Sequence, residues 1–297
     1  MFAGSMTALV TPMDRDGALD YAALARLIDF HIDAGTDALV IAGTTGESPT
    51  LEREEHVELL ERSCELAAGR LPIVAGTGSN STAQTLKLSR AVDHLPLAGL
   101  MVVTPYYNKP TQEGMYRHFS AIADAVSHPL ILYNVPGRTG VDLKPETVIR
   151  LASHANIAAV KEATAELDRV ERLRDGCGNE FALLSGDDAT AAEFMLRGGD
   201  GVISVTANVA PRQMKALCDA ARAGDRPRAE AIDEKLQALH RDLFVESNPI
   251  PVKWAVQQMG LIGPGIRLPL TPLSEQYHDV VRAALRTAGV EVRGSAG

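Results

Sequence analysis

Eight short apolar segments recur along the chain before residue 207, and each is continuously apolar rather than alternating. Continuous apolar runs of this length are typical of strands that are covered on both faces, as in a buried parallel sheet. The pattern therefore predicts parallel strands within residues 6–11, 38–43, 72–77, 99–104, 130–135, 157–162, 181–186 and 201–206.

Amphipathic segments at helical spacing separate these runs. Asp20 is the predicted N-cap of the first helix, and Gly35 follows its end. Pro145 and Pro211 stand where proline suits the first turn of a helix. Two of the apolar stripes consist of Leu24, Leu27, Ile28 and Ile32, and of Met115, Phe119, Ile122 and Val126.

Alternation of strand and helix that repeats eight times predicts an α/β fold, the (β/α)8 TIM barrel. An open doubly wound sheet is the alternative. Beyond the eighth run the pattern becomes helical, so we expect a catalytic barrel domain over residues 1–224 and a C-terminal helical region over residues 225–297. The apolar stripes of that region consist of Ile232, Leu236, Leu239 and Leu243, and of Val252, Val256 and Met259.

Composition narrows the class of partner. The formal net charge is -9 and no basic run occurs, which argues against nucleic acid or an anionic membrane as a partner. No stretch approaches the roughly 20 apolar residues that a membrane span needs, and the first residues lack the pattern of a cleaved signal. Cys64, Cys177 and Cys218 lie in no metal-ligand spacing and suggest no disulfide framework. We expect a cytoplasmic protein without a metal.

Chemistry is expected where the strands end, because active sites in this fold lie at the carboxyl ends of the strands. The segments that leave five of the runs are rich in hydroxyl, charged and glycine residues. They read GTTGES (43–48), TPYYNKP (104–110), YNVPGRTG (133–140), KEAT (161–164) and SGDD (185–188).

Lys161 is a lysine within an apolar strand, where burial disfavours the ammonium form. A neutral amine attacks a ketone to give a Schiff base, so Lys161 is the candidate nucleophile. An ion pair with Glu162 or another carboxylate is the open alternative. Lys253 also has apolar neighbours, but helical periodicity predicts that it lies on the rim of a helix.

Schiff-base chemistry needs proton transfer near the amine. Tyr133 ends the neighbouring strand, and Thr44 and Tyr107 offer further hydroxyls from other strand ends. The turn over residues 43–47 presents backbone N–H groups and hydroxyls, which suit a carboxylate. Arg138 follows in a loop where its guanidinium could hold a second carboxylate. The alternatives without a function are that Tyr133 is an ordinary core residue and that Arg138 is a solvated surface residue.

Taken together, these segments resemble a known family, the 4-hydroxy-tetrahydrodipicolinate synthases, formerly called dihydrodipicolinate synthases. The resemblance is strongest to the Gram-negative bacterial form and covers almost the whole chain. This family belongs to the pyruvate-dependent class I aldolase superfamily and serves the diaminopimelate and lysine pathway. The motifs occur in the family's order: GTTGES, TPYYN, YNVPGRTG, KEAT, SGDD, GVISVTANV and NPIPVKW.

The resemblance implies a lyase that condenses pyruvate with L-aspartate 4-semialdehyde, without a metal or organic cofactor. Lys161 would form the Schiff base, and the proton relay would be Tyr133, Thr44 and Tyr107, the last from a neighbouring subunit. Pyruvate would be bound by Thr45, Gly186 and Ile203, and Arg138 would hold the carboxylate of the semialdehyde. Such enzymes are commonly homotetramers built as dimers of dimers.

Many family members are inhibited by lysine, and the matching positions here are Ser48, His56, Asn80, Gln84 and Tyr106. Pro49, Arg53 and Gln84 depart from the bacterial pattern. Gln84 is a neutral amide where the family has a carboxylate for the effector's ammonium, which weakens binding by about 1 to 2 kcal/mol. We therefore predict weak or absent inhibition by lysine.

Three other functions remain as alternatives. Another pyruvate aldolase, such as N-acetylneuraminate lyase or a keto-deoxy sugar-acid aldolase, would share Lys161 and Tyr133 but would lack Arg138. A pyridoxal phosphate barrel would need a glycine-rich phosphate loop after the last strands, which the sequence lacks. A non-catalytic binding barrel would have little use for the lysine, relay and clamp together.

Overall fold

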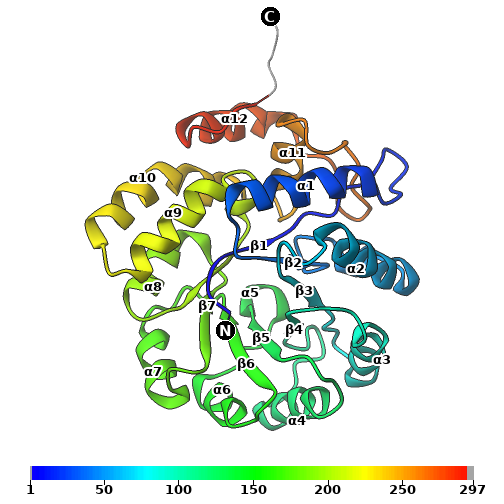
Figure 1. The fold of residues 1–297 in the computed structure, drawn as a ribbon, viewed down its shortest axis with the longest axis vertical. Helices are drawn as coiled ribbons and strands as arrows, with labels where there is room; N and C mark the ends of the chain where they lie inside the picture. The colour runs from blue at the N-terminus through cyan, green and yellow to red at the C-terminus, as the bar shows by residue number, and fades with distance from the viewer. Residues whose placement is uncertain (1, 293–297) are drawn as a thin grey trace, which may run out of the picture.

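The structure is a computed structural model that describes residues 2–292. Its strands pair in parallel and in sequence order, and the last pairs with the first to close a barrel. Helices surround this barrel in a ring (Figure 1). The predicted TIM barrel is confirmed, and the open doubly wound sheet is wrong. The strands are β1 (Gly4–Ala8), β2 (Ala38–Ile41), β3 (Ile73–Gly76), β4 (Gly99–Val103), β5 (Leu130–Asn134), β6 (Ile157–Glu162), β7 (Ala182–Ser185) and β8 (Gly201–Ser204).

Seven of the predicted segments contain the observed strand, but the first, residues 6–11, does not. β1 begins at Gly4, which pairs with Gly201 of β8. A search for apolar runs cannot detect the start of β1, because glycine has no apolar side chain. Glycine is required here, since a Cβ atom on Gly201 would lie 2.3 Å from the Gly4 carbonyl oxygen.

Three of the outer helices begin where the sequence predicts, and the first of them also ends as predicted. The Asp20 side chain accepts a hydrogen bond from the Ala23 N–H at 2.9 Å, and Gly35 ends the first helix with a left-handed φ of 77°. Prolines begin the sixth and ninth helices. The ring consists of α1 (Tyr21–Ala34), α2 (Arg53–Ala67), α3 (Thr82–Val92), α4 (Gln112–Ala123), α6 (Pro145–Ala152), α7 (Asp168–Cys177), α8 (Ala191–Leu196) and α9 (Pro211–Arg222).

The chain continues as helices beyond the barrel. α10 (Arg226–Asp242) packs outside α9, and α12 (His278–Thr287) packs against α10. α11 (Ile250–Gln258) lies near α12 above α1 in Figure 1. The connection from α10 to α11, residues 243–249, runs to the carboxyl ends of the strands, as its contacts below show. No helix within residues 2–292 is long and apolar enough to cross a membrane.

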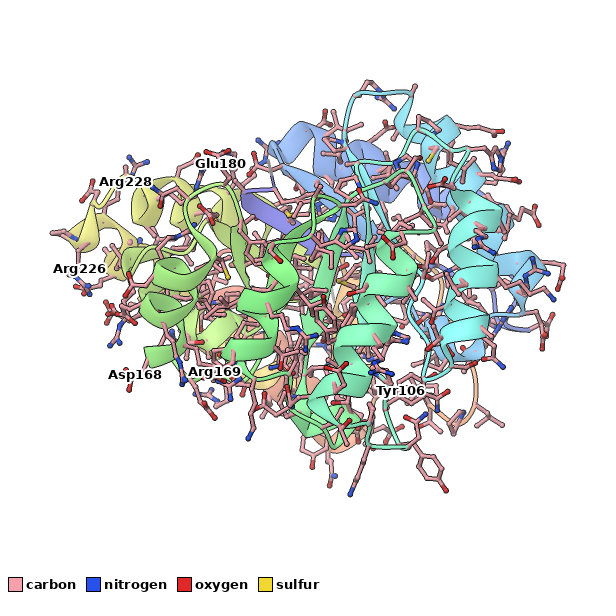
Figure 2. The ribbon with its side chains drawn as sticks, turned by 90° about the horizontal axis from the view of Figure 1, so that it is seen from below. Tyr106, Asp168, Arg169, Glu180, Arg226 and Arg228 are labelled. Atoms are coloured by element: carbon pink, nitrogen blue, oxygen red, sulfur yellow. The ribbon has the colours of Figure 1, made fainter. Side chains whose placement is uncertain are left out.

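Side chains fill the barrel interior, so the barrel is a packed core and not a pore. Met6, Met101, Ile131, Leu184 and Ile203 are buried in this inner layer, together with Tyr133 near its carboxyl end. The two ends of the barrel, at the carboxyl and the amino ends of the strands, can be followed in Figure 2. Tyr106, which follows β4, is labelled at one end, and Glu180, which precedes β7, is labelled at the other.

Candidate active site

A cavity of about 150 Å³ lies at the carboxyl ends of the strands. It brings together six of the predicted site residues, which come from four different strand ends. Its lining includes Gly186 and the polar residues Thr44, Thr45, Tyr133, Arg138, Lys161, Asp187 and Asn248. The position of this cavity agrees with the expected location of chemistry in a TIM barrel.

Lys161 extends from β6 beside Tyr133 of β5, and the two residues are registered partners across the strands. The Lys161 Nζ atom lies 4.3 Å from the centroid of the Tyr133 ring. The lysine is only 5% exposed. Burial lowers the pKa of Lys161 to about 8, the charge of Asp188 opposes that change, and the charge of Arg138 adds to it. At this pKa about a tenth of the amine is neutral at pH 7.

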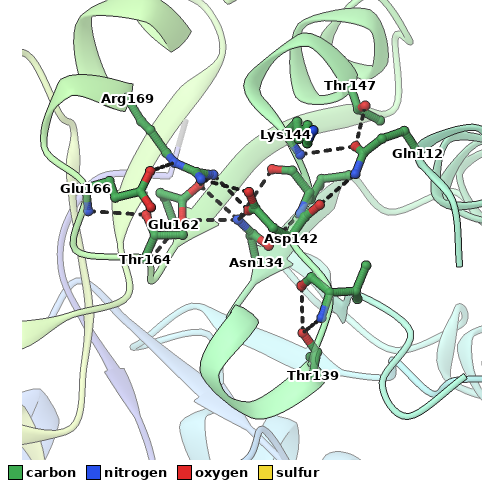
Figure 3. Close-up of polar contacts among 12 residues, drawn as sticks. Gln112, Asn134, Thr139, Asp142, Lys144, Thr147, Glu162, Thr164, Glu166 and Arg169 are labelled. Carbon is green, nitrogen blue, oxygen red and sulfur yellow. Dashed lines mark hydrogen bonds and ion pairs between the residues drawn. The ribbon is translucent and has the colours of Figure 1, made fainter. Parts of the chain in front are cut away.

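Glu162 does not pair with Lys161, so the alternative of an ion pair within KEAT is wrong. Successive side chains of a strand point to opposite faces, and Glu162 points out of the barrel. There its carboxylate accepts hydrogen bonds from the Asn134 amide at 3.1 and 3.2 Å (Figure 3). Its second neighbour is Arg169, at 3.5 Å. Among residues 2–292, Lys161 has no ion pair.

Arg169 joins this outer network to the loop after β5. Its guanidinium donates two hydrogen bonds of 2.8 Å to Asp142 and one of 2.7 Å to Glu166 (Figure 3). Asn134 completes the network by donating to Asp142 at 2.9 Å. Asn134 and Glu162 are the strand neighbours of Tyr133 and Lys161, so the network fixes the backbone behind the two residues of the cavity.

Tyr133 is buried, and burial raises the pKa of its phenol, while the Arg138 charge and a hydrogen bond with Thr44 act in the opposite direction. The phenol therefore keeps its proton near neutral pH and can donate it.

Gly186 must be a glycine, because a Cβ atom there would lie 3.0 Å from Lys161 Cε and 2.6 Å from the Ala163 Cβ. Its missing side chain leaves room for the lysine.

The turn that contains Thr44 and Thr45 is less open to an anion than the sequence predicted. The N–H groups of Gly46 and Glu47 donate to carbonyl oxygens inside the turn, both at 3.1 Å. The turn leads into a three-residue 3-10 helix, Ser48–Thr50, rather than directly into α2. Thr44 and Thr45 line the cavity, so they are the residues of this turn that face a ligand.

Arg138 lies in a single helical turn, α5 (Pro136–Thr139), and not in the loop that the sequence predicted. The N–H of Thr139 donates to the Val135 carbonyl at 3.1 Å, which closes this turn. The Arg138 guanidinium is exposed at the cavity mouth and donates to the main-chain oxygen of Asn248 at 3.3 Å. It can still turn toward a carboxylate in the cavity.

Two of the predicted residues do not line this cavity. Ile203 of β8 is buried in the inner layer of the barrel. Tyr107 is 88% exposed, has a left-handed φ of 72°, and is absent from the cavity lining. An outward-facing tyrosine on a strained backbone is unusual for a residue without a partner surface.

A second, larger cavity of about 650 Å³ shares Thr44 and Arg138 with the first. Four of the five positions matched to the lysine-sensitive form line it, namely Ser48, His56, Gln84 and Tyr106, and Asn80 does not. The His56 Nε2 atom lies 2.8 Å from the Gly76 oxygen, and burial lowers the pKa of this histidine. Arg53 and Lys87 also line the cavity, whereas no acidic side chain does.

A third cavity, of about 690 Å³, lies at the amino ends of the strands, between Phe2 and Arg222. It contains none of the predicted site residues.

Sequence reasoning missed three buried polar residues near the site. Lys253 is buried and forms an ion pair with Glu47, so the prediction of a helix rim is wrong. Asp188 is buried and accepts from the N–H groups of Val205 and Thr206, both at 2.9 Å. Asn248 lines the cavity from the C-terminal region. The motifs SGDD and NPIPVKW contained these residues, but a single sequence does not show which side chain of a motif faces inward.

Comparison with known proteins places the chain in a family. The model of the dihydrodipicolinate synthetase family matches residues 1–288. The 4-hydroxy-tetrahydrodipicolinate synthase of Thioalkalivibrio sulfidiphilus is 58% identical over 290 residues, which cover 98% of this chain and 99% of that protein.

Solved structures give the same result. The dihydrodipicolinate synthase of Acinetobacter baumannii, crystallised as a complex with pyruvate, is 52% identical with a TM-score of 0.96, over 98% of this chain and 100% of that one. The enzyme of Aquifex aeolicus is 44% identical with a TM-score of 0.96, over 99% of this chain and 100% of that one. The chain belongs to the dihydrodipicolinate synthetase family.

Proposed function

We propose that this chain is a lyase that condenses pyruvate with L-aspartate 4-semialdehyde to give 4-hydroxy-tetrahydrodipicolinate, the first committed step toward diaminopimelate and lysine. One observation carries the proposal. The buried amine of Lys161 has no carboxylate partner within residues 2–292, lies 4.3 Å from the Tyr133 ring centroid, and shares its cavity with Thr45 and Arg138. The pyruvate complex of the Acinetobacter baumannii relative supports pyruvate as the first substrate.

The reaction begins when the neutral Lys161 amine attacks the ketone carbon of pyruvate and forms a carbinolamine. Loss of water gives the Schiff base, and loss of a proton from the methyl carbon gives the enamine. The enamine carbon then bonds to the aldehyde carbon of the semialdehyde. The amino group of that substrate attacks the Schiff-base carbon, which closes the ring and releases the lysine. No metal or organic cofactor takes part.

Each proton transfer needs a donor and an acceptor close to the reacting atoms. Tyr133 is the donor nearest to Lys161, and Thr44 is its hydrogen-bonding neighbour. Thr45 holds the pyruvate carboxylate, and Arg138 at the mouth holds the carboxylate of the semialdehyde. Gly186 shapes the pyruvate pocket, and Ile203 supports it from the inner layer of the barrel, which also contains Tyr133.

Tyr107 completes the relay from a neighbouring subunit. Its 88% exposure and outward position support this role, because its own chain does not bring it to the cavity. The catalytic unit is then a dimer, and the full assembly is a homotetramer. The three cysteines are free, which suits a reducing cytoplasm.

Substrate choice is the sharpest test of this function. Turnover is measured with pyruvate plus L-aspartate 4-semialdehyde and, in parallel, with N-acetylneuraminate. We expect turnover of pyruvate plus the semialdehyde and no turnover of N-acetylneuraminate. An Arg138→Leu variant should lose most of this activity, because the carboxylate of the semialdehyde then has no cationic partner. Cleavage of N-acetylneuraminate without turnover of the semialdehyde would overturn the proposal in favour of a sugar-acid aldolase.

The larger cavity leads to a prediction about feedback. Its described lining contains Arg53 and Lys87, a neutral Gln84 and no carboxylate. The ammonium groups of free lysine therefore find no carboxylate among these residues, so inhibition should be weak or absent. Initial rates measured against millimolar lysine test this prediction. Gln84→Glu should increase lysine sensitivity, and strong inhibition of the unaltered chain below 1 mM, roughly a physiological effector level, would contradict it.

A further inference from the structure

Asn248 brings the C-terminal region into the active site. It lies in the connection between α10 and α11, is 6% exposed, and lines the 150 Å³ cavity beside Lys161 and Arg138. Its side-chain Oδ1 is buried and has no hydrogen-bond partner in the part of the chain that the structure describes. A buried polar atom of this kind carries a desolvation cost, so it points to a role in binding or positioning.

The Asn248 amide contacts the residue proposed to hold the pyruvate carboxylate. Its Nδ2 donates a hydrogen bond of 3.0 Å to Thr45 Oγ1. A hydroxyl has one proton and two acceptor sites. Because Asn248 donates, it occupies an acceptor site of Thr45 and leaves the hydroxyl proton available. No group within residues 2–292 accepts that proton, so it is available to a ligand in the cavity.

The Asn248 main chain contacts the other proposed carboxylate ligand. Its carbonyl oxygen accepts from Arg138 Nη2 at 3.3 Å. One residue therefore links Thr45, on the turn after β2, with Arg138, on α5. The two proposed carboxylate sites share this single support.

The connection that carries Asn248 is fixed to the turn that carries Thr45. Lys253 of α11 forms a buried ion pair with Glu47, two residues after Thr45. The main-chain N–H of Arg267 also donates to Glu47, at 3.1 Å. These contacts hold α11 against the turn, so Asn248 and Thr45 keep their relative position.

We infer that Asn248 is a positioning residue that directs the Thr45 hydroxyl proton toward the carboxylate of the keto acid, and so sets the affinity for pyruvate. This inference rests on the proposed function, since it assumes that Thr45 binds pyruvate. The amide orientation decides the outcome. With Oδ1 toward Thr45, the hydroxyl would donate to Asn248 and lose its proton for the substrate.

A double-mutant cycle with Thr45 tests the inference. Asn248→Ala should raise KM for pyruvate by about tenfold and change kcat by less than about twofold, because one directed hydrogen bond to a carboxylate is lost. In a Thr45→Val background the same substitution should change KM by less than about twofold. Equal effects in both backgrounds would overturn the inference.

A second variant keeps the shape of the side chain. Asn248→Asp can only accept, so it takes the Thr45 proton and places a negative charge near the pyruvate carboxylate. KM for pyruvate should rise more than in Asn248→Ala. If Asn248→Ala does not fold, Asn248→Asp provides the test. An unchanged KM for pyruvate in Asn248→Asp would overturn the inference.

Asn156→Ala is the matched control for loss of a structural asparagine. The Asn156 amide donates to the Ala123 and Val126 oxygens at 3.0 and 2.9 Å, just before β6. This variant should melt at a lower temperature with an unchanged KM for pyruvate. Failure of the proposed function can be distinguished from failure of the inference about Asn248. If the proposed function is wrong, the unaltered chain shows no turnover with pyruvate and L-aspartate 4-semialdehyde.

Discussion

Two lysines of this chain are buried to nearly the same extent but lie in different surroundings. Lys161 of β6 is 5% exposed, and Lys253 of α11 is 4% exposed. Lys253 forms an ion pair with Glu47, whereas Lys161 has no ion pair among residues 2–292 and faces a cavity. Burial lowers the pKa of both, and the Glu47 charge opposes this change at Lys253.

The difference shows that burial alone does not make a lysine a nucleophile. A carboxylate in contact stabilises the ammonium form, so the paired amine remains charged and serves as a link between elements. An amine without such a partner is neutral for a larger fraction of time and can attack a ketone. We therefore propose a catalytic role for Lys161 and a structural role for Lys253.

Lys161→Met should have the largest effect on activity. Methionine keeps the length and the apolar stem but removes the amine, so turnover should fall by at least roughly a thousandfold. Stability should be unchanged or slightly increased, because an unpaired cation no longer has to be buried. Steady-state rates and urea unfolding measure the two effects. Retained turnover would contradict the assignment.

Lys253→Met should have the opposite profile. The substitution leaves Glu47 buried without its cation, which costs about 3 to 5 kcal/mol of unfolding free energy. Turnover of the protein that remains folded should persist, though reduced, because Thr45 lies close to Glu47. Adding Glu47→Gln removes the orphaned charge and should recover most of the stability. A double variant no more stable than Lys253→Met would refute the ion-pair account.

Arg169→Met tests the network behind the cavity. Its guanidinium is 12% exposed and serves Asp142, Glu162 and Glu166, so its loss should cost about 2 to 3 kcal/mol of unfolding free energy. The exposed pair of Arg172 with Glu146 provides the control. Arg172→Met should change stability by less than about 0.5 kcal/mol. Equal losses in urea unfolding would show that the network has no special role.

The smallest expected effect is a shift of the pH profile. In the proposed mechanism the neutral amine is the nucleophile, so kcat/KM for pyruvate should rise with pH and level off near the Lys161 pKa of about 8. The Asp188 charge raises that pKa, so Asp188→Asn should move the bend to lower pH. A bend that stays in place or moves upward would show that Asp188 does not act on Lys161.

The barrel could be predicted from the sequence because each strand is buried on both faces and therefore appears as an apolar run. Lys161 interrupts such a run, so its burial followed directly from the pattern. β1 was misplaced because its first residues, Gly4 and Ser5, are small and carry no apolar signal. The alternation within β6 also separates Lys161 from Glu162, although the sequence left their pairing open.

The rest of the site could not be predicted from the residue pattern, because it depends on contacts between distant segments. Lys253 and Glu47 are 206 residues apart, and Asn248 and Thr45 are 203 apart. Helical periodicity placed Lys253 on a helix rim, and it gave no sign of the carboxylate that pairs with this lysine inside the protein. The role proposed for Tyr107 depends on a second subunit, which the sequence of one chain cannot place. A motif can mark such residues, but only the fold shows which ones meet.

Reduction with borohydride in the presence of pyruvate tests the central claim most directly. The reagent converts a Schiff base into a stable secondary amine, which peptide mass mapping can locate. The account predicts one pyruvate-derived adduct on Lys161, none on Lys253, and none in Lys161→Met. An adduct on another lysine, or none at all in an enzyme that turns over, would contradict it.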